Sequence, residues 1–151
     1  MLIRSLFFLL FPLITYAQTF SHGRFVARNN AIFWTERFDV KDMDEPIIAQ
    51  TVREQLEAKK YVCFDTLQEH EVLSGWLIDP PASTIAKARF RIDILFEKYQ
   101  VTVSDMLESG PFDTAIIENS LLQSDGNFSR NLSKRLEKLD RTMMEIFEIK
   151  Q

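Results

Sequence analysis

The clearest strand pattern in the sequence runs from Ala86 to Tyr99, where apolar and polar side chains alternate. Successive side chains of a strand point to opposite faces of a sheet, so this pattern predicts one buried face and one mostly wet face. Such a strand needs a second layer over its apolar side, and antiparallel sheets commonly have this one-sided character. The side chains expected on the buried face are Ala88, Phe90, Ile92, Ile94 and Phe96.

Two further segments are expected to join this sheet. Ala31–Val40 is dominated by β-branched and aromatic residues, with Glu36 as the one misfit, and predicts the first strand. Val101–Leu107 predicts an antiparallel partner for Ala86–Tyr99 across a tight turn. The side chains of the first strand expected in the core are Ile32, Trp34, Phe38 and Val40.

A β-hairpin is expected between these segments. Tyr61–Leu67 and Glu71–Asp79 are separated by a short polar turn, and Pro80 ends the second strand because proline lacks a backbone N–H. The second strand has apolar side chains on both of its faces. The residues assigned to the buried face are Val72, Trp76 and Ile78, and those left on the opposite face are Leu73 and Leu77.

Two segments carry the three- and four-residue spacing of amphipathic helices. The first is expected to begin after Asp44, which can cap a helix N-terminus, and to extend to about Lys60. The second runs from Phe128, with Asn127 or Ser129 as its cap. Only about three heptads are present, which favours packing against the sheet over a coiled coil. The apolar stripe of the second helix is Phe128, Leu132, Leu136, Leu139, Met143 and Ile146.

The first seventeen residues have the three parts of a secretory signal peptide. Arg4 supplies the positive start, Leu6–Ile14 the apolar stretch and Ala17 the small residue before the cleavage site. The apolar stretch falls short of the roughly 20 residues needed to cross a bilayer, so we expect cleavage between Ala17 and Gln18 and no transmembrane anchor after processing. The expected localisation is export, either periplasmic or secreted. Residues 18–29 are polar and without a period, and are interpreted as a flexible leader.

The resulting order is strand, helix, four strands and helix in one domain, residues 30–151. We expect an α+β fold in which a curved antiparallel sheet carries two helices on one face. The connection from Glu108 to Gly126 leaves open whether Ala115–Gln123 is helical. The sheet face opposite the helices is called the open face, and it is the candidate interaction face. Its expected residues are Phe33, Leu73, Leu77, Arg89, Arg91 and Leu95.

Five stretches carry a family resemblance: IFWTERFDV, EPIIAQTVREQLEAKK, VLSGWLI, ARFRIDILFEKYQVTVSDM and LSKRLEKLDRTMMEIF. Together they resemble a family of small secreted proteins of unknown function from Bacteroidetes-type bacteria, described as having a TATA-binding-protein-like (TBP-like) fold. The resemblance covers roughly residues 30–149 and implies this fold, with no catalytic residues or cofactors. The fold label implies a shape and not DNA binding.

Composition and motifs argue against several classes of function. The formal net charge of −4 disfavours a nucleic-acid partner, which usually requires a basic surface. No phosphate loop, dinucleotide motif or metal-ligand spacing occurs, so we expect no cofactor and no metal. His22 and His70 lie in the leader and in a turn, which are poor positions for a nucleophile and base, and we expect no enzyme. The single cysteine, Cys63, lies between Val62 and Phe64, which favours a small buried side chain over a reactive thiol, and a disulfide-linked dimer stays open if the side chain faces outward.

Three functions remain in competition. The preferred one is a non-enzymatic envelope module that binds another protein, a peptide or a glycan through the open face, because exposed apolar patches mark interaction sites. The alternative is a carrier of a small hydrophobic ligand held between the sheet and the C-terminal helix. A hydrolase that uses His70 is the third. The residues expected to line the carrier cavity are Phe90, Ile94, Phe96, Met143 and Phe147.

Overall fold

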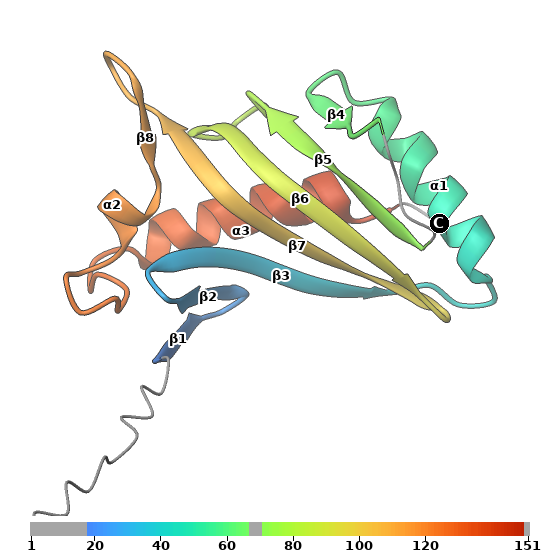
Figure 1. Cartoon of the computed structure of the whole chain (residues 1–151), viewed down its shortest axis with the longest axis horizontal. Helices are drawn as coiled ribbons and strands as arrows, with labels where there is room; N and C mark the ends of the chain where they lie inside the picture. Colours follow the sequence, from blue (N-terminus) through green and yellow to red (C-terminus); the bar gives the residue numbers. More distant parts are fainter. Residues whose placement is uncertain (1–17, 67–70, 150–151) are drawn as a thin grey trace, which may run out of the picture.

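The computed structural model describes residues 18–66 and 71–149 and has an α+β fold (Figure 1). Its elements are β1 (Thr19–His22), β2 (Phe25–Arg28), β3 (Ala31–Asp39), α1 (Glu45–Glu57), β4 (Val62–Phe64), β5 (Val72–Ile78), β6 (Ile85–Leu95), β7 (Lys98–Ser109), β8 (Thr114–Ile116), α2 (Glu118–Leu121) and α3 (Ser133–Phe147). One curved antiparallel sheet spans the molecule, and α1 and α3 lie on the same side of it, behind the sheet in Figure 1. This arrangement confirms the expected fold class.

The sheet joins its strands in the order β1-β2-β3-β7-β6-β5-β4, and β8 pairs with the far end of β7. All of these pairings are antiparallel. Strand β7 pairs with β3 from Lys98 to Val103 and with β8 from Leu107 to Ser109. The β7–β8 hairpin therefore extends past the end of β3, at the upper left of Figure 1.

The segment interpreted as a flexible leader forms a β-hairpin at the edge of the sheet. Strand β1 pairs with β2, and β2 pairs with β3 through Phe25 opposite Trp34. Phe25 and Ala27 are both buried in the core. Asn29 and Asn30 join β2 to β3 with positive φ values of 52° and 59°, as the favoured two-residue hairpin turns require. The leader interpretation was wrong because these two strands are too short for a period to show.

Strand β5 faces the opposite way from its predicted orientation. Leu73 and Leu77 are 5% and 0% exposed and belong to the core, whereas Trp76 lies half-buried on the open face. Gly75 lies on the core side beneath Phe90, where an added Cβ would come within 2.7 Å of Phe90 Cζ. A shift of one residue exchanges the two faces of a strand, so the whole apolar assignment of β5 is reversed.

Two local irregularities move side chains away from their expected places. Phe96 lies in the β6–β7 turn next to Glu97, which has a φ of 53°, and is 66% exposed instead of buried. Asp105 has a φ of 49°, close to a register shift in the pairing of β6 with β7. Such a bulge changes the face of the sheet to which the following side chains point. Leu107 consequently lies half-buried on the open face rather than in line with Val103 in the core.

Helix α1 has the expected cap and the expected buried stripe. The Asp44 side chain accepts a hydrogen bond from the backbone N–H of Ile47 at 3.1 Å, which satisfies one of the free amides of the first turn. The three buried residues are Ile48, Val52 and Leu56, as predicted.

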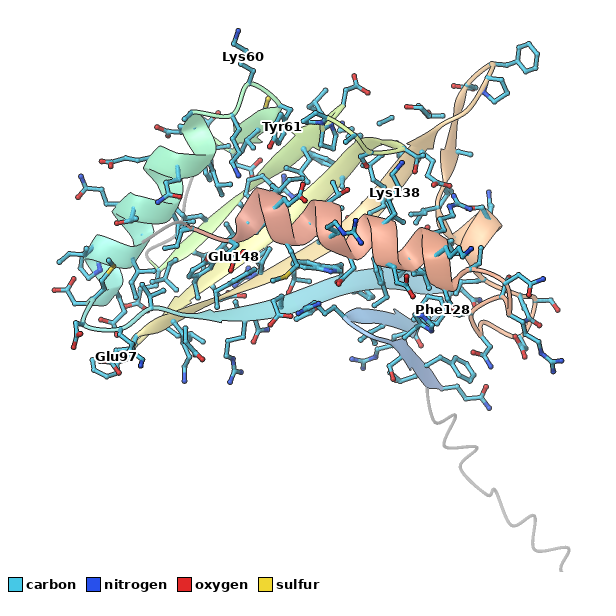
Figure 2. The ribbon with its side chains drawn as sticks, turned by 180° about the vertical axis from the view of Figure 1, so that it is seen from behind. Lys60, Tyr61, Glu97, Phe128, Lys138 and Glu148 are labelled. Atoms are coloured by element: carbon cyan, nitrogen blue, oxygen red, sulfur yellow. The ribbon has the colours of Figure 1, made fainter. Side chains whose placement is uncertain are left out.

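Helix α3 lies along the face of the sheet opposite the open face (Figure 2). It begins later in the sequence than predicted. Its N-cap is Leu132, without a side-chain hydrogen bond, so Asn127 and Ser129 are not its caps. Lys138 lies on its exposed side, and Glu148 follows its last residue (Figure 2). Among the described residues, no helix has the length and apolar character needed to cross a membrane. The buried residues of the α3 stripe include Leu136, Leu139, Met143 and Ile146, as predicted.

The carboxylate of Glu108 on β7 contacts both the short helix α2 and helix α3. Glu108 is buried, and its Oε2 accepts a hydrogen bond from Ser120 Oγ at 2.9 Å and pairs with Arg135. Its other oxygen accepts from Thr84 Oγ1 at 3.1 Å. The predicted segment 115–123 is thus divided between the end of β8 and this one-turn helix.

A half-buried cluster of polar side chains connects the N-terminal hairpin and β3 to α3 by hydrogen bonds. Trp34 Nε1 donates to Asp140 Oδ1 at 2.8 Å, and Arg24 Nη1 donates to Asp140 Oδ2 at 2.7 Å. Arg24 also forms an ion pair with Glu36. The apparent misfit of Glu36 in its strand is explained by this pairing, since a carboxylate turned toward the helices needs a cation.

The side chains proposed to line a carrier cavity are mostly ordinary core residues. Phe90, Ile94, Met143 and Phe147 are all buried, and the rings of Phe90 and Phe147 meet edge to face with centroids 5.7 Å apart. Phe96 is exposed at the turn and does not face the interior.

Cys63 is exposed, contrary to the buried position expected for it. It lies on the short edge strand β4, directly opposite Trp76 of β5. Because neighbouring residues of a strand alternate, Val62 and Phe64 pack toward the core and Cys63 points to the open face.

Candidate functional site

The open face carries the predicted interaction residues only in part. Leu73 and Leu77 are core residues, so the centre of the face is more polar than expected. The predicted residues that do lie on it are Phe33, Arg89, Arg91 and Leu95. Of the predicted cleavage site, Gln18 is exposed, whereas Ala17 and the rest of the signal peptide lie outside the described residues, as does His70.

A polar hollow of about 470 Å³ lies on the open face over β5, β6 and β7. Its main feature is a bidentate ion pair in which Arg89 Nη1 and Nη2 donate to the two Asp65 oxygens at 2.8 and 2.5 Å. Ser74 Oγ donates to the same carboxylate at 2.6 Å. The residues that line this polar hollow are Asp65, Val72, Ser74, Arg89, Arg91, Thr102 and Ser104.

These contacts fix the charges in the polar hollow. The hydrogen bonds from Arg89 and then Ser74 lower the pKa of Asp65, and the bond to Asp65 raises the pKa of Arg89. Arg91 pairs with Asp93, with Arg91 Nε and Asp93 Oδ1 2.9 Å apart. The hollow therefore presents paired charges and hydroxyls in fixed positions, which suits hydrogen bonding to a polar ligand. Within residues 18–66 and 71–149, no three acidic, His or Cys side chains are placed to share a metal ion.

Trp76 is the large aromatic side chain beside the polar hollow. Lys87 Nζ lies 4.0 Å from the centroid of its ring, and Arg89 Cζ lies 5.1 Å from it. Cations close to an indole ring are attracted by its electron-rich face. The two cations on β6 therefore hold Trp76 against the sheet and link it to the Arg89 ion pair.

An apolar row crosses the open face at the end that carries the β7–β8 hairpin. In the pairing of β5, β6, β7 and β8, Ile78 lies opposite Lys87, Lys87 opposite Leu107 and Leu107 opposite Ile116. We call Ile78, Leu107 and Ile116, with the aliphatic stem of Lys87 between them, the apolar row. Ile78 and Ile116, at the two ends of the row, are both exposed, and Leu107 between them is half-buried.

An apolar hollow of about 470 Å³ adjoins this row. Trp76, Leu107 and Ile116 supply its apolar walls, and Lys87 and Asn119 lie among its polar lining residues. A second hollow on the other side of the row shares Lys87 and Leu107 with it. The apolar row thus separates two depressions on one face of the molecule.

The tip of the β7–β8 hairpin presents a fully exposed phenylalanine. Gly110–Asp113 forms a tight turn in which the Gly110 N–H donates to the Asp113 carbonyl at 2.8 Å. Pro111 holds one backbone angle of the turn, and Phe112 is 100% exposed. An added Cβ on Gly110 would come within 2.5 Å of the Asp113 carbonyl oxygen, so the turn requires glycine there. We call this segment the Phe112 turn.

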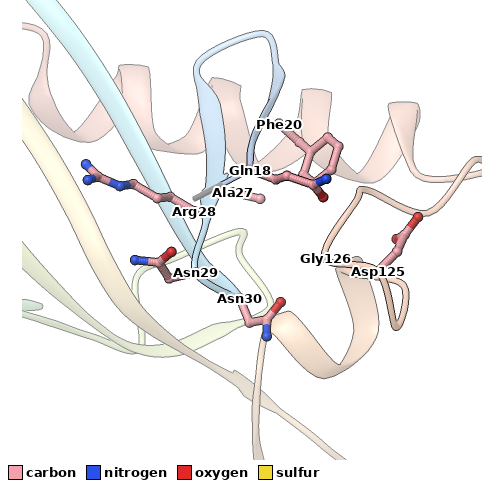
Figure 3. Close-up of a pocket in the computed structure, with 8 residues that line it drawn as sticks. All are labelled: Gln18, Phe20, Ala27, Arg28, Asn29, Asn30, Asp125 and Gly126. Carbon is pink, nitrogen blue, oxygen red and sulfur yellow. The ribbon is translucent and has the colours of Figure 1, made fainter. Parts of the chain in front are cut away.

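A fourth depression lies away from the open face, between the N-terminal hairpin and the segment before α3 (Figure 3). It has a volume of about 250 Å³. In Figure 3, Gln18 and Phe20 lie on the hairpin side, with Asp125 and Gly126 across from them. Gly126 has a φ of 81°, and a Cβ there would approach Asn30 Oδ1 to 2.9 Å. The depression is small and polar, and it marks a close backbone approach rather than a pocket for an apolar group.

Sequence reasoning missed the most exposed part of the site. Trp76 and Ile78 were assigned to the core because the orientation of β5 was reversed. Ile116 and Phe112 lie in a connection whose Gly-Pro pair indicated only a break in the chain. A usable signal was present, since glycine and proline in succession are typical of a tight turn between strands.

Comparison with known proteins finds two solved structures of similar fold. A DUF4468 family protein from Bacteroides ovatus has a TM-score of 0.49 and 11% identity, and the match covers 78% of this chain and 80% of that chain. A TBP-like protein from Parabacteroides distasonis has a TM-score of 0.47 and 14% identity, with 78% and 85% covered. Both come from Bacteroidetes, the bacterial group of the family that the sequence resembles. No protein-family profile and no curated protein matches the chain.

Proposed function

We propose that this chain is an exported, non-enzymatic recognition domain of the cell envelope, which binds another protein, a peptide or a glycan through the open face. Export rests on the signal-peptide pattern of residues 1–17. We propose that the domain is not an enzyme because Asp65 and Arg89, two charged residues of the open face, form a bidentate ion pair with each other. A paired carboxylate with a lowered pKa is a poor general base.

One observation carries this proposal: the apolar row lies next to the Phe112 turn on a face that none of the described helices covers. Exposed apolar side chains are common singly, but contiguous groups with a polar rim mark interaction surfaces. The rim here is polar, with Lys87 and Asn119 at the apolar hollow and the Arg89 ion pair beyond Trp76. The same molecule thus offers an apolar contact surface and fixed hydrogen-bonding groups beside it, as recognition sites do.

The alternative function, carriage of a small hydrophobic ligand between the sheet and α3, has less support. Its proposed lining residues Phe90, Met143 and Phe147 are buried, and the rings of Phe90 and Phe147 are in contact. A ligand would have to displace these contacts, and well-packed cores resist such expansion.

The proposal is tested by comparing two matched substitutions. Tagged wild-type protein, Ile116→Asp and Ile47→Asp are each incubated with envelope extract, and the bound material is identified by mass spectrometry. Ile116 is 53% exposed in the apolar row, and Ile47 is 50% exposed on α1, so the same change is made at the same exposure. We expect Ile116→Asp to lose the material that the wild type and Ile47→Asp both retain, because a buried carboxylate in an interface is costly.

Unfolding curves in urea serve as the control for both variants, since each residue is exposed and neither change should lower the stability by more than about 0.5 kcal/mol. Equal retention by Ile116→Asp and the wild type would show that the apolar row is not the contact surface. Measurable turnover that depends on a residue of the open face would contradict the non-enzymatic part of the proposal.

A further inference from the structure

We infer that Gln18 of the exported protein is converted to pyroglutamate, a five-membered lactam that replaces the free N-terminal amine. This inference rests on the export that is part of the proposed function, because cleavage after Ala17 gives Gln18 the free α-amine that the reaction needs. The modification site adjoins β1, at one edge of the sheet and away from the open face. It is therefore independent of what the open face binds.

The reaction is an internal transamidation that needs no second substrate. The neutral α-amine attacks the side-chain carbon Cδ of the same residue, and a bond forms between the backbone nitrogen and Cδ. The bond from Cδ to Nε2 breaks, a proton passes from the amine to Nε2, and ammonia leaves. Glutamine, unlike asparagine, places its amide carbon where a five-membered ring can close, and such an intramolecular attack has a large proximity advantage.

The structure leaves the Gln18 side chain free to react. Gln18 is exposed and directly precedes β1. Within residues 18–66 and 71–149, no side chain or backbone group forms a hydrogen bond with its amide. The first residue paired in the sheet is Thr19, which lies opposite Arg28. Ring closure therefore breaks no contact of the Gln18 side chain and leaves the pairing of β1 with β2 in place.

The charges in the depression beside Gln18 favour the uncharged product. Arg28 and Asp125 are the two charged side chains that line this depression. Arg28 is exposed and forms no ion pair with any of the described residues. A free α-ammonium would be a second cation here, opposed by the single carboxylate of Asp125. Ring closure removes that cation and leaves one charge of each sign.

The depression also has room for the product ring. Its volume of about 250 Å³ exceeds the ~150 Å³ of an apolar cavity that holds benzene, which is a larger ring. Phe20 offers an apolar surface on the hairpin side (Figure 3). Asn29 and Asn30 line the same depression, and their side-chain amides can both donate to and accept from the groups of a lactam.

The consequence of the modification is protection of the N-terminal hairpin from aminopeptidases. These enzymes bind a free α-ammonium, which a lactam lacks. Strand β1 is the outermost strand at its edge of the described sheet, where it pairs with β2. Stepwise trimming would therefore begin at an edge strand, and chain ends are where proteolysis concentrates. The hairpin supplies Phe25 to the core, so its loss would affect the fold.

The test uses the full-length gene, so that the cell itself removes residues 1–17, and measures the intact mass of the exported protein. We expect the mass of residues 18–151 less one molecule of ammonia. We also expect an N-terminus that resists stepwise chemical sequencing until pyroglutamyl peptidase removes the lactam and exposes Thr19. The mass and the blocked N-terminus are independent signs of the same bond.

Gln18→Glu is the matched control for both measurements. The side chain has the same length, but a carboxylate is a poor electrophile, so this variant should keep its full mass and a readable N-terminus. When both exported proteins are incubated with an aminopeptidase, Gln18→Glu should lose residue 18 and the wild type should lose nothing. Equal trimming of the two proteins would overturn the protective role.

A rate comparison tests the structural part of the inference. A protease that cuts a fusion protein directly before Gln18 gives the chain with its amine free. This chain is held near pH 8, where a large fraction of an α-amine with an ordinary pKa of about 7.7–8.0 is neutral. We expect ammonia to be lost at closely similar rates with and without guanidinium chloride, because folding gives the Gln18 side chain no contact to break. Loss from the unfolded chain alone would overturn the inference.

The remaining outcomes separate this inference from the proposed function. An exported chain that begins at Gln18 with its full mass and a readable N-terminus would overturn the modification and leave the export intact. An exported chain cleaved at another position would do the same. A chain that keeps residues 1–17 and stays in the cytoplasm would refute both the modification and the envelope function.

Discussion

Tyr99 shows how one side chain can connect the sheet to the end of α3. Its hydroxyl donates to the carbonyl of Phe147 at 2.7 Å and accepts from the Ile149 N–H at 3.1 Å. Its ring is fully buried and stacks on Phe38 with centroids 4.9 Å apart. The hydroxyl therefore satisfies two backbone groups at a helix end, where four carbonyls lack a partner within the helix.

The stability of the protein should fall between pH 10 and pH 12 because of this residue. Burial raises the pKa of Tyr99 from 10.0 to about 12. An unfolded chain loses the tyrosine proton near pH 10, whereas the folded chain keeps it until about pH 12. The stabilisation is therefore complete below pH 10 and is lost as the pH rises through 12, by roughly 3 kcal/mol. Urea unfolding at a series of pH values measures this loss.

Tyr99→Phe is the control for the pH series. At neutral pH this variant should be less stable than the wild type by about 1–3 kcal/mol, because two buried backbone groups lose their partner. Its stability should then fall less between pH 10 and 12 than that of the wild type. A wild type and a variant that decline in parallel over this range would show that Tyr99 is not the group responsible.

At the scale of elements, the N-terminal hairpin contributes to the core and therefore to stability. Residues 18–29 contain β1 and β2, and Phe25 of β2 lies opposite the buried Trp34. The hairpin is also joined to α3 through Arg24 and Asp140. A segment that supplies core side chains and a half-buried ion pair is part of the folding unit and not an appendage.

Phe25→Ala should destabilise the protein by about 3–5 kcal/mol, the usual cost of removing a buried aromatic side chain. Phe112→Ala makes the same chemical change at a fully exposed position and should change the stability by less than about 0.5 kcal/mol. Both values come from urea unfolding of the two variants beside the wild type. Equal stability of Phe25→Ala and Phe112→Ala would mean that the hairpin does not pack as described.

The orientation of β5 is also decided at this scale. The segment VLSGWLI has apolar residues on both faces, so the alternation itself does not indicate which face is buried. Packing decides, because Gly75 alone leaves room for Phe90 on the core side, while Trp76 finds two cations on the open face. The contacts that select this orientation come from β6, and a strand examined alone does not contain them.

At the scale of the whole molecule, the signal-peptide pattern makes a direct prediction. The exported protein should begin at Gln18, because Ala17 is the small residue that precedes the expected cleavage site. Mass spectrometry of the intact protein from the periplasm or medium measures its N-terminus. Substitution of Ala17 by a bulky residue should cause the uncleaved form to accumulate. A full-length chain found only in the cytoplasm would contradict both the cleavage and the proposed envelope function.

The amino-acid sequence by itself determined the features that depend on local periodicity and local chemistry. The alternation in Ala86–Tyr99, the cap at Asp44 and the stripe of α3 were sufficient for an α+β fold with helices on one face of a sheet. These signals are strong because each repeats over several residues of one element.

The tertiary structure alone decided which side chains form the open face. The bulge at Asp105 turned Leu107 outward, Gly75 placed Trp76 beside Lys87, and the pairing of β8 with β7 completed the apolar row. Each of these outcomes depends on contacts between residues distant in sequence, and no local pattern contains them. The candidate site was therefore only partly predictable, because an interaction face consists of what is left uncovered once every other element has packed.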